Sequence, residues 1–183
     1  MPRIYTKTGD DGTTGLLYGG RIPKSDPVAD AFGTTDEAVA VLGLARSLCD
    51  DVMRATLLIL QRELFVVGAD LAANPEERGK LQAGVSLVDA AMTQRLEQQI
   101  DDLVAERPLP ETFIVPGANP GSAAIDVGRA VVRRAERRVV ELEQTGREVN
   151  PEVRRYLNRL SDLLFVLARW QAGESEPPSR AEV

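Results

Sequence analysis

The sequence predicts an all-α fold, a five-helix up-and-down bundle that follows an irregular, Gly/Thr-rich N-terminal loop. Apolar residues recur every three or four positions through five long segments, which is the spacing of amphipathic helices. Glycines and prolines gather between these segments and in residues 1–27, where they indicate turns and loops. A chain of 183 residues is long enough for one domain with a continuous apolar core.

The expected helices cover residues 28–48, 52–72, 86–106, 121–145 and 151–171. Ser86 is the expected N-cap of the third helix. Asn150, Pro151 and Glu152 predict the start of the fifth, because they supply an N-cap, a proline at the first helical position and an acid in the first turn. The polar residues 74–84 contain Pro and two Gly and predict a mobile loop.

One domain is expected over residues 1–173. It divides into an N-terminal segment, residues 1–27, and the helical bundle, residues 28–173. Residues 174–183 are rich in Glu, Pro and Ser, a composition that predicts a disordered tail.

Composition excludes several classes of function. The chain has no histidine, which excludes Ser-His-Asp and Cys-His catalysis and His-ligated zinc. Its single cysteine, Cys49, leaves no internal disulfide and no multi-cysteine metal site. A net charge of −6 argues against nucleic-acid binding. Without an apolar run of about 18 residues or an N-terminal apolar region, no membrane span or secretory signal is expected, and a cytoplasmic location follows.

The first candidate for chemistry is a Gly-rich loop with hydroxyl groups and lysines. Such loops can wrap phosphates through their backbone N–H groups. It lacks the GxxxxGK[ST] pattern of a P-loop, and a flexible N-terminal turn is the alternative interpretation. We call the following residues the N-terminal candidates: Thr6, Lys7, Thr8, Gly9, Thr13, Thr14 and Lys24.

The second candidate is an arginine-rich stretch, residues 129–138, with five Arg and one Glu. At 100° per residue, positions 129, 133 and 136 lie within about 60° of one another on one helix face. Arginine forks bind triphosphate oxygens in a bidentate manner and keep their charge at any physiological pH. The alternative is a solvated face with Glu–Arg pairs one turn apart.

Two further polar groups have both a functional and a structural interpretation. Asn158 lies one turn from Asp162 beside the apolar stripe of the last helix, where neighbouring helices commonly satisfy polar residues. Asp36 and Glu37 are expected near the start of the first helix, where carboxylates complement the helix dipole.

In combination, these pieces resemble one family, the PduO-type ATP:cob(I)alamin adenosyltransferases. The resemblance spans nearly the whole chain in the family's order. It rests on IYTKTGDDGTT (4–14), Lys24-Ser25-Asp26, Gly33-Thr34-Thr35-Asp36-Glu37, Gln61…Leu64-Phe65…Gly68-Ala69-Asp70-Leu71-Ala72, Phe113-Ile114-Val115-Pro116-Gly117, RAVVRRAER (129–137) and YLNRLSDLLFVLAR (156–169). The sequence departs from the family's usual pattern at Ala38-Val39, residues 117–121 and Ile125-Asp126.

The resemblance implies roles for the matching positions. The N-terminal candidates would hold ATP phosphates. The rest of ATP and its Mg²⁺-linked triphosphate would contact what we call the helix candidates, Arg133, Arg134, Glu136, Arg137 and Asn158. Asp36 and Arg129 resemble the family's intersubunit salt bridge at the site. Phe113, in a short apolar island between prolines, resembles the aromatic residue that packs against the lower face of the corrin.

The implied activity is attack of Co(I) of cobalamin on C5′ of ATP, which gives adenosylcobalamin and triphosphate. The implied assembly is a homotrimer with active sites between subunits. Further implied partners are a cob(II)alamin reductase and an adenosylcobalamin-dependent enzyme. Two other interpretations remain: a cobalamin and ATP escort protein of the same fold without catalysis, and a helical scaffold whose arginines merely face solvent.

Overall fold

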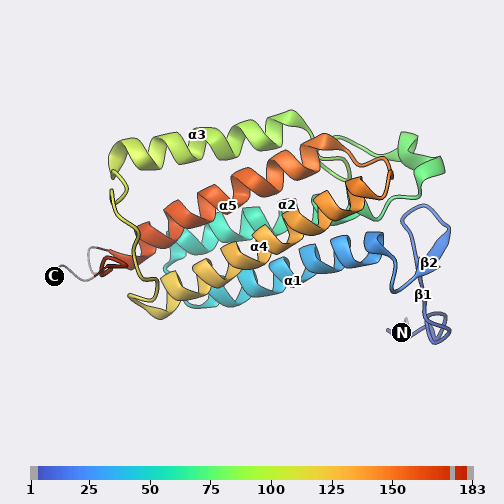
Figure 1. The fold of residues 1–183 in the computed structure, drawn as a ribbon, viewed down its shortest axis with the longest axis horizontal. Helices are drawn as coiled ribbons and strands as arrows, with labels where there is room; N and C mark the ends of the chain where they lie inside the picture. The colour runs from blue at the N-terminus through green and yellow to red at the C-terminus, as the bar shows by residue number, and fades with distance from the viewer. Residues whose placement is uncertain (1–3, 174–175, 181–183) are drawn as a thin grey trace.

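The computed structural model describes residues 4–173 and 176–180. Five long helices lie side by side along the longest axis of the molecule (Figure 1): α1 (Pro27–Ser47), α2 (Asp51–Leu71), α3 (Ala90–Glu106), α4 (Pro120–Gln144) and α5 (Pro151–Ala172). The predicted all-α bundle is confirmed. In the described part of the chain, no helix combines the length and the apolar character that a membrane span requires.

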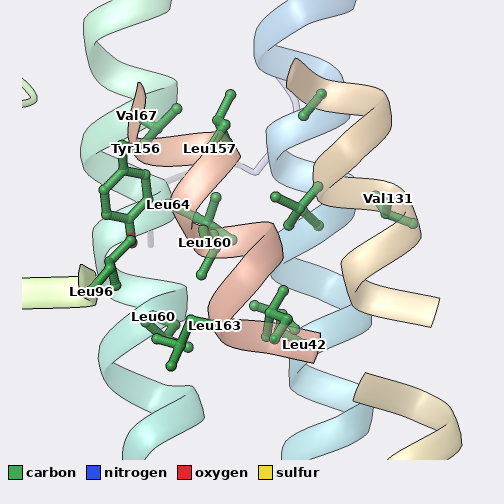
Figure 2. Close-up of a cluster of buried hydrophobic side chains, with 14 of the residues drawn as sticks. Leu42, Leu60, Leu64, Val67, Leu96, Val131, Tyr156, Leu157, Leu160 and Leu163 are labelled. Atoms are coloured by element: carbon green, nitrogen blue, oxygen red, sulfur yellow. The ribbon is translucent and has the colours of Figure 1, made fainter. Parts of the chain in front are cut away.

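Four of these helices form the central bundle. Helix α1 packs against α2 and α4, and α4 packs against α5, while α3 covers the outer side of α5 (Figure 1). Each fully buried leucine contributes about 1.5–3 kcal/mol by leaving water. The core includes Leu42, Leu60, Leu64, Val67, Leu96, Val131, Leu157, Leu160 and Leu163 (Figure 2).

The close approach of α1 and α4 depends on Gly128. A Cβ at this position would lie 2.6 Å from Cδ2 of Leu42, a fully buried side chain. Real carbon contacts do not occur at that distance, because packed interiors have no free space for the extra carbon. The absence of a side chain at residue 128 therefore sets the spacing between the two helices.

Side-chain caps fix where the helices begin. Asn150 accepts a hydrogen bond from the N–H of Glu152 at 3.1 Å, so the expected start of α5 is confirmed. The expected start of the third helix is wrong. Asp89, whose Oδ1 accepts from the N–H of Met92 at 2.9 Å, is its N-cap, whereas the Ser86 hydroxyl accepts from the N–H of Gln82 at 3.0 Å.

The segment expected to be a mobile loop contains a short 3-10 helix, η1 (Pro75–Lys80). Asn74 caps it by accepting from the N–H of Glu76 at 3.2 Å. Arg78 then donates to the main-chain oxygen of Asp70 at 3.1 Å and so ties η1 to the end of α2. A cap and a tertiary hydrogen bond hold this segment in place, which its polar composition alone did not predict.

The N-terminal loop is more regular than expected. Strands β1 (Thr13–Gly15) and β2 (Arg21–Pro23) form an antiparallel hairpin. The hairpin docks at the end of α2, because Leu17 donates to the oxygen of Ala72 at 2.8 Å and accepts from the N–H of Asn74 at 3.0 Å. Figure 1 shows the hairpin at the end of the bundle where α1 and α5 begin.

Residues 174–183 were expected to be disordered, but within this range residues 176–180 form backbone hydrogen bonds with the segment before α4. The N–H of Val115 donates to the oxygen of Pro177 at 2.8 Å, and the N–H of Ser179 donates to the oxygen of Phe113 at 2.6 Å. These two backbone hydrogen bonds give this stretch a fixed partner that its composition does not reveal. Residues 174–175 and 181–183 lie outside the described part of the chain.

Candidate functional site

Arg21 organises the N-terminal candidates. Its guanidinium donates to Oγ1 of Thr13 at 2.7 and 2.9 Å and to the main-chain oxygen of Thr8 at 2.5 Å. Asp11 accepts from both the N–H and the hydroxyl of Thr13, at 2.9 and 2.7 Å, and these bonds lower the pKa of its carboxyl. The hydroxyls of Thr6 and Thr8 lie 2.7 Å apart. The loop is therefore internally bonded yet exposed to solvent.

The structure brings Lys24 to this loop. A Cβ built on Gly9 would lie 3.4 Å from Nζ of Lys24 and 3.1 Å from the main-chain oxygen of Thr13. The lysine also lines a shallow pocket of about 580 Å³ with residues of α1 and the end of α4. Thr14 pairs with Ile22 in the hairpin. The N-terminal candidates thus form one exposed surface with a lysine ammonium beside them.

An ion pair holds this surface against the bundle. Arg147, in the connection between α4 and α5, donates to both carboxylate oxygens of Asp26 at 2.5 and 2.8 Å. This bidentate contact lowers the pKa of the Asp26 carboxyl and raises that of the guanidinium. Asp26 also caps α1 by accepting from the N–H of Val28 at 2.9 Å. The N-terminal segment therefore has a defined position relative to α1 and α4.

Four of the five helix candidates gather along α4 and α5. Asn158 donates to Oε1 of Glu136 at 2.9 Å. Two adjoining shallow pockets, of about 550 and 420 Å³, share Glu136 and Val140 in their walls; Asn158 lines the first, and Arg133 and Arg137 line the second. The packing of α4 against α5 brings Glu136 and Asn158 together.

Arg133 and Arg137 differ from the arginines beside them. Arg134 pairs with Glu37 of α1 at 2.5 Å, and Arg138 pairs with Asp30 of α1 at 2.9 Å. Among the residues that the structure describes, Arg133 and Arg137 have no carboxylate partner within ion-pair distance. Within the described residues, the arginine-rich stretch thus has one face that is paired with α1 and a second face, Arg133 and Arg137, that makes no ion pair and lines a pocket with Glu136 and Glu141.

Arg134 does not join this group in the single chain. Its guanidinium points to α1, where its partner Glu37 is half exposed. This is an ion pair between two surface side chains, and such pairs contribute about 0–1 kcal/mol to the free energy of unfolding. Arg134 thus fits the interpretation of a solvated, ion-paired helix face, whereas Arg133 and Arg137 remain the candidates for binding triphosphate.

Asp36 and Arg129 do not contact each other within one chain. Arg129 donates from Nε to Oδ1 of Asp126 at 3.2 Å and is partly exposed. Asp36 is exposed and has no ion-pair partner in the described residues. It also lies in the middle of α1, so the expectation that it sits in the first turn and complements the helix dipole is wrong.

Phe113 lies in the connection between α3 and α4 and is 88% exposed. Val115, which follows on the same segment, is 48% exposed. Phe113 is therefore not anchored in the core: its main chain accepts a hydrogen bond from Ser179, and its ring is exposed. A solvated aromatic on a fixed backbone is a surface that a flat apolar ligand can cover.

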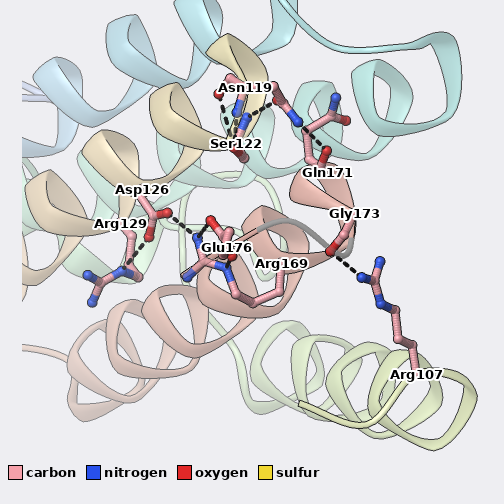
Figure 3. Close-up of polar contacts among 9 residues, drawn as sticks. All are labelled: Arg107, Asn119, Ser122, Asp126, Arg129, Arg169, Gln171, Gly173 and Glu176. Atoms are coloured by element: carbon pink, nitrogen blue, oxygen red, sulfur yellow. Dashed lines mark hydrogen bonds and ion pairs between the residues drawn. The ribbon is translucent and has the colours of Figure 1, made fainter. Parts of the chain in front are cut away.

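Sequence reasoning missed a buried charge cluster near this end of the bundle. Arg169 is 4% exposed and contacts both Asp126 and Glu176, while Asp126 also accepts from Arg129 (Figure 3). The ring centroid of Phe165 lies 4.9 Å from Cζ of Arg169 and 5.9 Å from Cζ of Arg129, so both guanidinium groups are within cation–π range of one ring. The only sequence signal was a lone Arg at the end of an apolar helix.

Comparisons with known proteins find matches over most of this chain. The family model described as cobalamin adenosyltransferase matches residues 4–171. The chain is 41% identical to the corrinoid adenosyltransferase of Citrobacter freundii over 170 residues, which covers 92% of this chain and 94% of that protein. It is 41% identical to the corrinoid adenosyltransferase of Homo sapiens over 175 residues, which covers 94% of this chain and 70% of the human protein.

A solved structure has the same fold. A variant PduO-type ATP:corrinoid adenosyltransferase from Lactobacillus reuteri, complexed with cobalamin and ATP, aligns with a TM-score of 0.85 at 32% identity. The alignment covers 96% of this chain and 97% of that one.

Proposed function

The chain belongs to the cobalamin adenosyltransferase family, and on that premise we propose that it transfers the 5′-deoxyadenosyl group of ATP to cob(I)alamin. In this reaction the Co(I) electron pair forms the Co–C5′ bond, the C5′–O bond breaks, and triphosphate leaves with the bonding electrons. No proton has to move in that step. A chain without histidine can therefore perform it by positioning the reactants and stabilising the leaving charge.

The observation that carries this proposal is that Arg133 and Arg137 make no ion pair in the described residues and line the pocket that adjoins Asn158. Arg134 and Arg138, which belong to the same stretch, each form an ion pair with a carboxylate of α1. Two guanidinium groups left toward a pocket wall provide donors for a polyphosphate. The N-terminal candidates, with Lys24 beside Gly9, add backbone N–H groups, hydroxyls and an ammonium for the same ligand.

The N-terminal candidates and Phe113 lie at opposite ends of the helical bundle of one subunit. The hairpin sits where α4 ends, whereas the Phe113 segment precedes α4 (Figure 1). A helix of 25 residues, the length of α4, spans about 37 Å at 1.5 Å per residue. ATP and the corrin must lie next to each other for the reaction. The N-terminal segment of one subunit and the Phe113 segment of another can therefore bind them together more readily than the two segments of a single subunit.

We therefore propose a homotrimer with its active sites between subunits. Helices α1 and α2 carry large apolar side chains that are more than half exposed, Leu44, Val52, Ile59 and Phe65. Such a surface is suited to burial against a second copy. The exposed Asp36 and the partly exposed Arg129 are available for an ion pair across that interface, as the family resemblance implies.

Mg²⁺ belongs to the proposal only as the companion of ATP. The described residues contain no group of three or more Cys, Asp or Glu that could hold a metal ion. Mg²⁺ commonly binds through substrate phosphates with one or two carboxylates, so a protein cage is unnecessary. Glu136, which lines both adjoining pockets, is the carboxylate placed to face it.

Phe113 is proposed to cover the lower face of the corrin. The electron that converts Co(II) to Co(I) enters an orbital whose energy falls when the lower axial ligand is removed. An apolar ring at that face would exclude both the ligand base and water. A location in the cytoplasm, a cob(II)alamin reductase as electron donor and an adenosylcobalamin-dependent enzyme as acceptor complete the proposal.

The test is to incubate the protein with ATP, Mg²⁺ and chemically reduced cobalamin and follow the visible spectrum and triphosphate release together. We expect adenosylcobalamin and triphosphate in equal amounts. Arg133→Ala and Arg137→Ala should each lower kcat/KM for ATP by about 10–100-fold, the loss of a charge-assisted contact. Cobalamin binding without triphosphate release would refute transfer and favour an escort protein.

The matched control is Arg154→Ala. Arg154 lies at the rim of the same pocket as Asn158 but is paired with Glu143 at 3.3 Å, and its side chain is about half exposed. A surface ion pair of this kind contributes about 0–1 kcal/mol. If Arg154→Ala costs as much as Arg133→Ala, general positive charge rather than the unpaired arginines explains ATP binding.

A further inference from the structure

Glu176 is a carboxylate from the C-terminal segment that is buried against the bundle. Its side chain is 6% exposed and contacts the guanidinium of Arg169 through both oxygens, one of them at 3.0 Å from Nη2 (Figure 3). Arg169 contacts Asp126 on its other side. The guanidinium therefore lies between two carboxylates contributed by α4 and by the C-terminal segment.

This arrangement makes the three buried charges interdependent. A buried guanidinium requires partners, because removing an unpaired ion from water is strongly unfavourable. Burial raises the pKa of the Glu176 carboxyl and the neighbouring Asp126 adds to this effect, whereas Arg169 opposes both. The contact with Arg169 thus offsets the desolvation of the buried Glu176 carboxylate.

The residues directly after Glu176 hold the Phe113 segment. Pro178 lies opposite Ile114 in an antiparallel bridge. The hydrogen bonds from Val115 N–H to Pro177 and from Ser179 N–H to Phe113 flank that bridge. The ring of Phe113 is exposed, so its own packing does not fix the segment. Its main chain is held by the C-terminal segment, which in turn is held by Glu176.

We propose that Glu176 is a positioning residue: its contact with Arg169 anchors residues 176–180, and the anchored segment sets the position of Phe113 under the corrin. The anchoring is a property of the fold. Its effect on turnover rests on the proposed function. Glu176 itself touches neither substrate in this scheme and acts through the backbone of residues 113–115.

The first experiment measures amide hydrogen exchange in the unliganded full-length protein. Glu176→Gln keeps the size of the side chain and removes its charge. We expect exchange at Val115 and Ser179 to become about 10-fold faster or more, the consequence of losing a hydrogen bond to a charged group. Glu176→Asp, which keeps the charge, should restore part of the protection. Unchanged exchange at both amides in Glu176→Gln would overturn the anchor.

The second experiment links the anchor to turnover. Glu176→Gln should lower kcat about 10-fold while KM for ATP changes less than twofold, because Arg133 and the N-terminal candidates are not altered. The Co(II)alamin bound with ATP should show a smaller four-coordinate fraction by electron paramagnetic resonance. Combined with Phe113→Ala, it should add little to the loss that Phe113→Ala causes alone.

Controls separate the two ideas. Glu106→Gln makes the same chemical change at an exposed carboxylate at the end of α3, and its exchange, kcat and four-coordinate fraction should equal those of the original chain. Faster exchange with multiplicative losses in the double variant would refute the route through Phe113. Absence of adenosyl transfer by the original chain, with the exchange result as expected, would refute the proposed function while the anchor stands.

Discussion

Asp70 is the buried residue whose replacement tests the packing beneath the N-terminal segment. Its side chain is 1% exposed at the end of α2. Oδ1 accepts from Arg78 at 2.6 Å, while Oδ2 accepts from the N–H of Val88 at 2.9 Å and from Nδ2 of Asn150 at 2.7 Å. One carboxylate thus joins α2, η1, the approach to α3 and the start of α5.

The informative perturbation is Asp70→Asn, which changes charge without changing size. An amide has one acceptor oxygen, so if it serves Val88 and Asn150 its NH₂ group must face the Arg78 guanidinium. The lost charge-assisted hydrogen bond costs about 1.5–3 kcal/mol. Arg78 is 24% exposed and can bind water instead, which keeps the cost within that range. In a domain of this size the melting temperature should fall by roughly 4–12 °C.

The assay is thermal and urea unfolding of both proteins at equal concentration, because an oligomer's stability depends on concentration. Asp101→Asn is the matched control, since Asp101 is exposed on α3; it should change stability by less than about 0.5 kcal/mol. A loss below about 1 kcal/mol for Asp70→Asn, or one equal to the control, would refute the view that this carboxylate holds the four segments together.

Three other predictions address the assembly and the site. Arg129→Ala and Asp36→Ala should each reduce turnover severely and the double variant should be little worse; strictly additive losses would argue against the proposed pair. Light scattering should give about 60 kDa, three subunits of 19.9 kDa, and a stable, fully active monomer would contradict it. Asp26→Asn keeps the α1 cap but loses the charge that Arg147 stabilises, so it should lower the melting temperature at pH 7 by roughly 3–10 °C. Because the pKa of Asp26 is lowered in the folded state, this stability is present above its unfolded value and is lost as the pH falls through the folded one. The difference between the two proteins should therefore shrink below about pH 4 in pH-dependent melting curves.

The helices were predictable because their signals are local. The apolar spacing of residues 124, 127, 131, 135, 139 and 142 predicts the buried face of α4 without reference to any other segment, and it is wrong only at Val127, which is 54% exposed. Asn150 and Pro151 likewise mark the start of α5 through bonds within one turn. The predicted start of α3 was wrong because both Ser86 and Asp89 can cap a helix. Val88, which lies between them, is held outside the helix by hydrogen bonds to Asp70 and Asn150, and these contacts are tertiary.

The candidate residues divide in the same way. Residue types and their order predicted Arg133, Arg137 and Asn158 as candidates, and helix periodicity placed residues 129, 133 and 136 on one face. Which arginines remain unpaired depends on Asp30 and Glu37, which α1 brings alongside α4. That distinction needs the distance between two helices.

The sequence by itself determined the bundle and the family, and it supplied the residues that we propose to meet ATP and the corrin, because periodicity, caps and ordered motifs are written along the chain. Only the tertiary structure decided that Arg169 is buried between Asp126 and Glu176, and that the C-terminal segment fixes the backbone of Phe113. Apart from the contact between Arg169 and Glu176, which are seven positions apart, these contacts join residues that are tens of positions apart. Their energies come from desolvation and ion pairing, which depend on the final packing and leave no periodic pattern in the sequence.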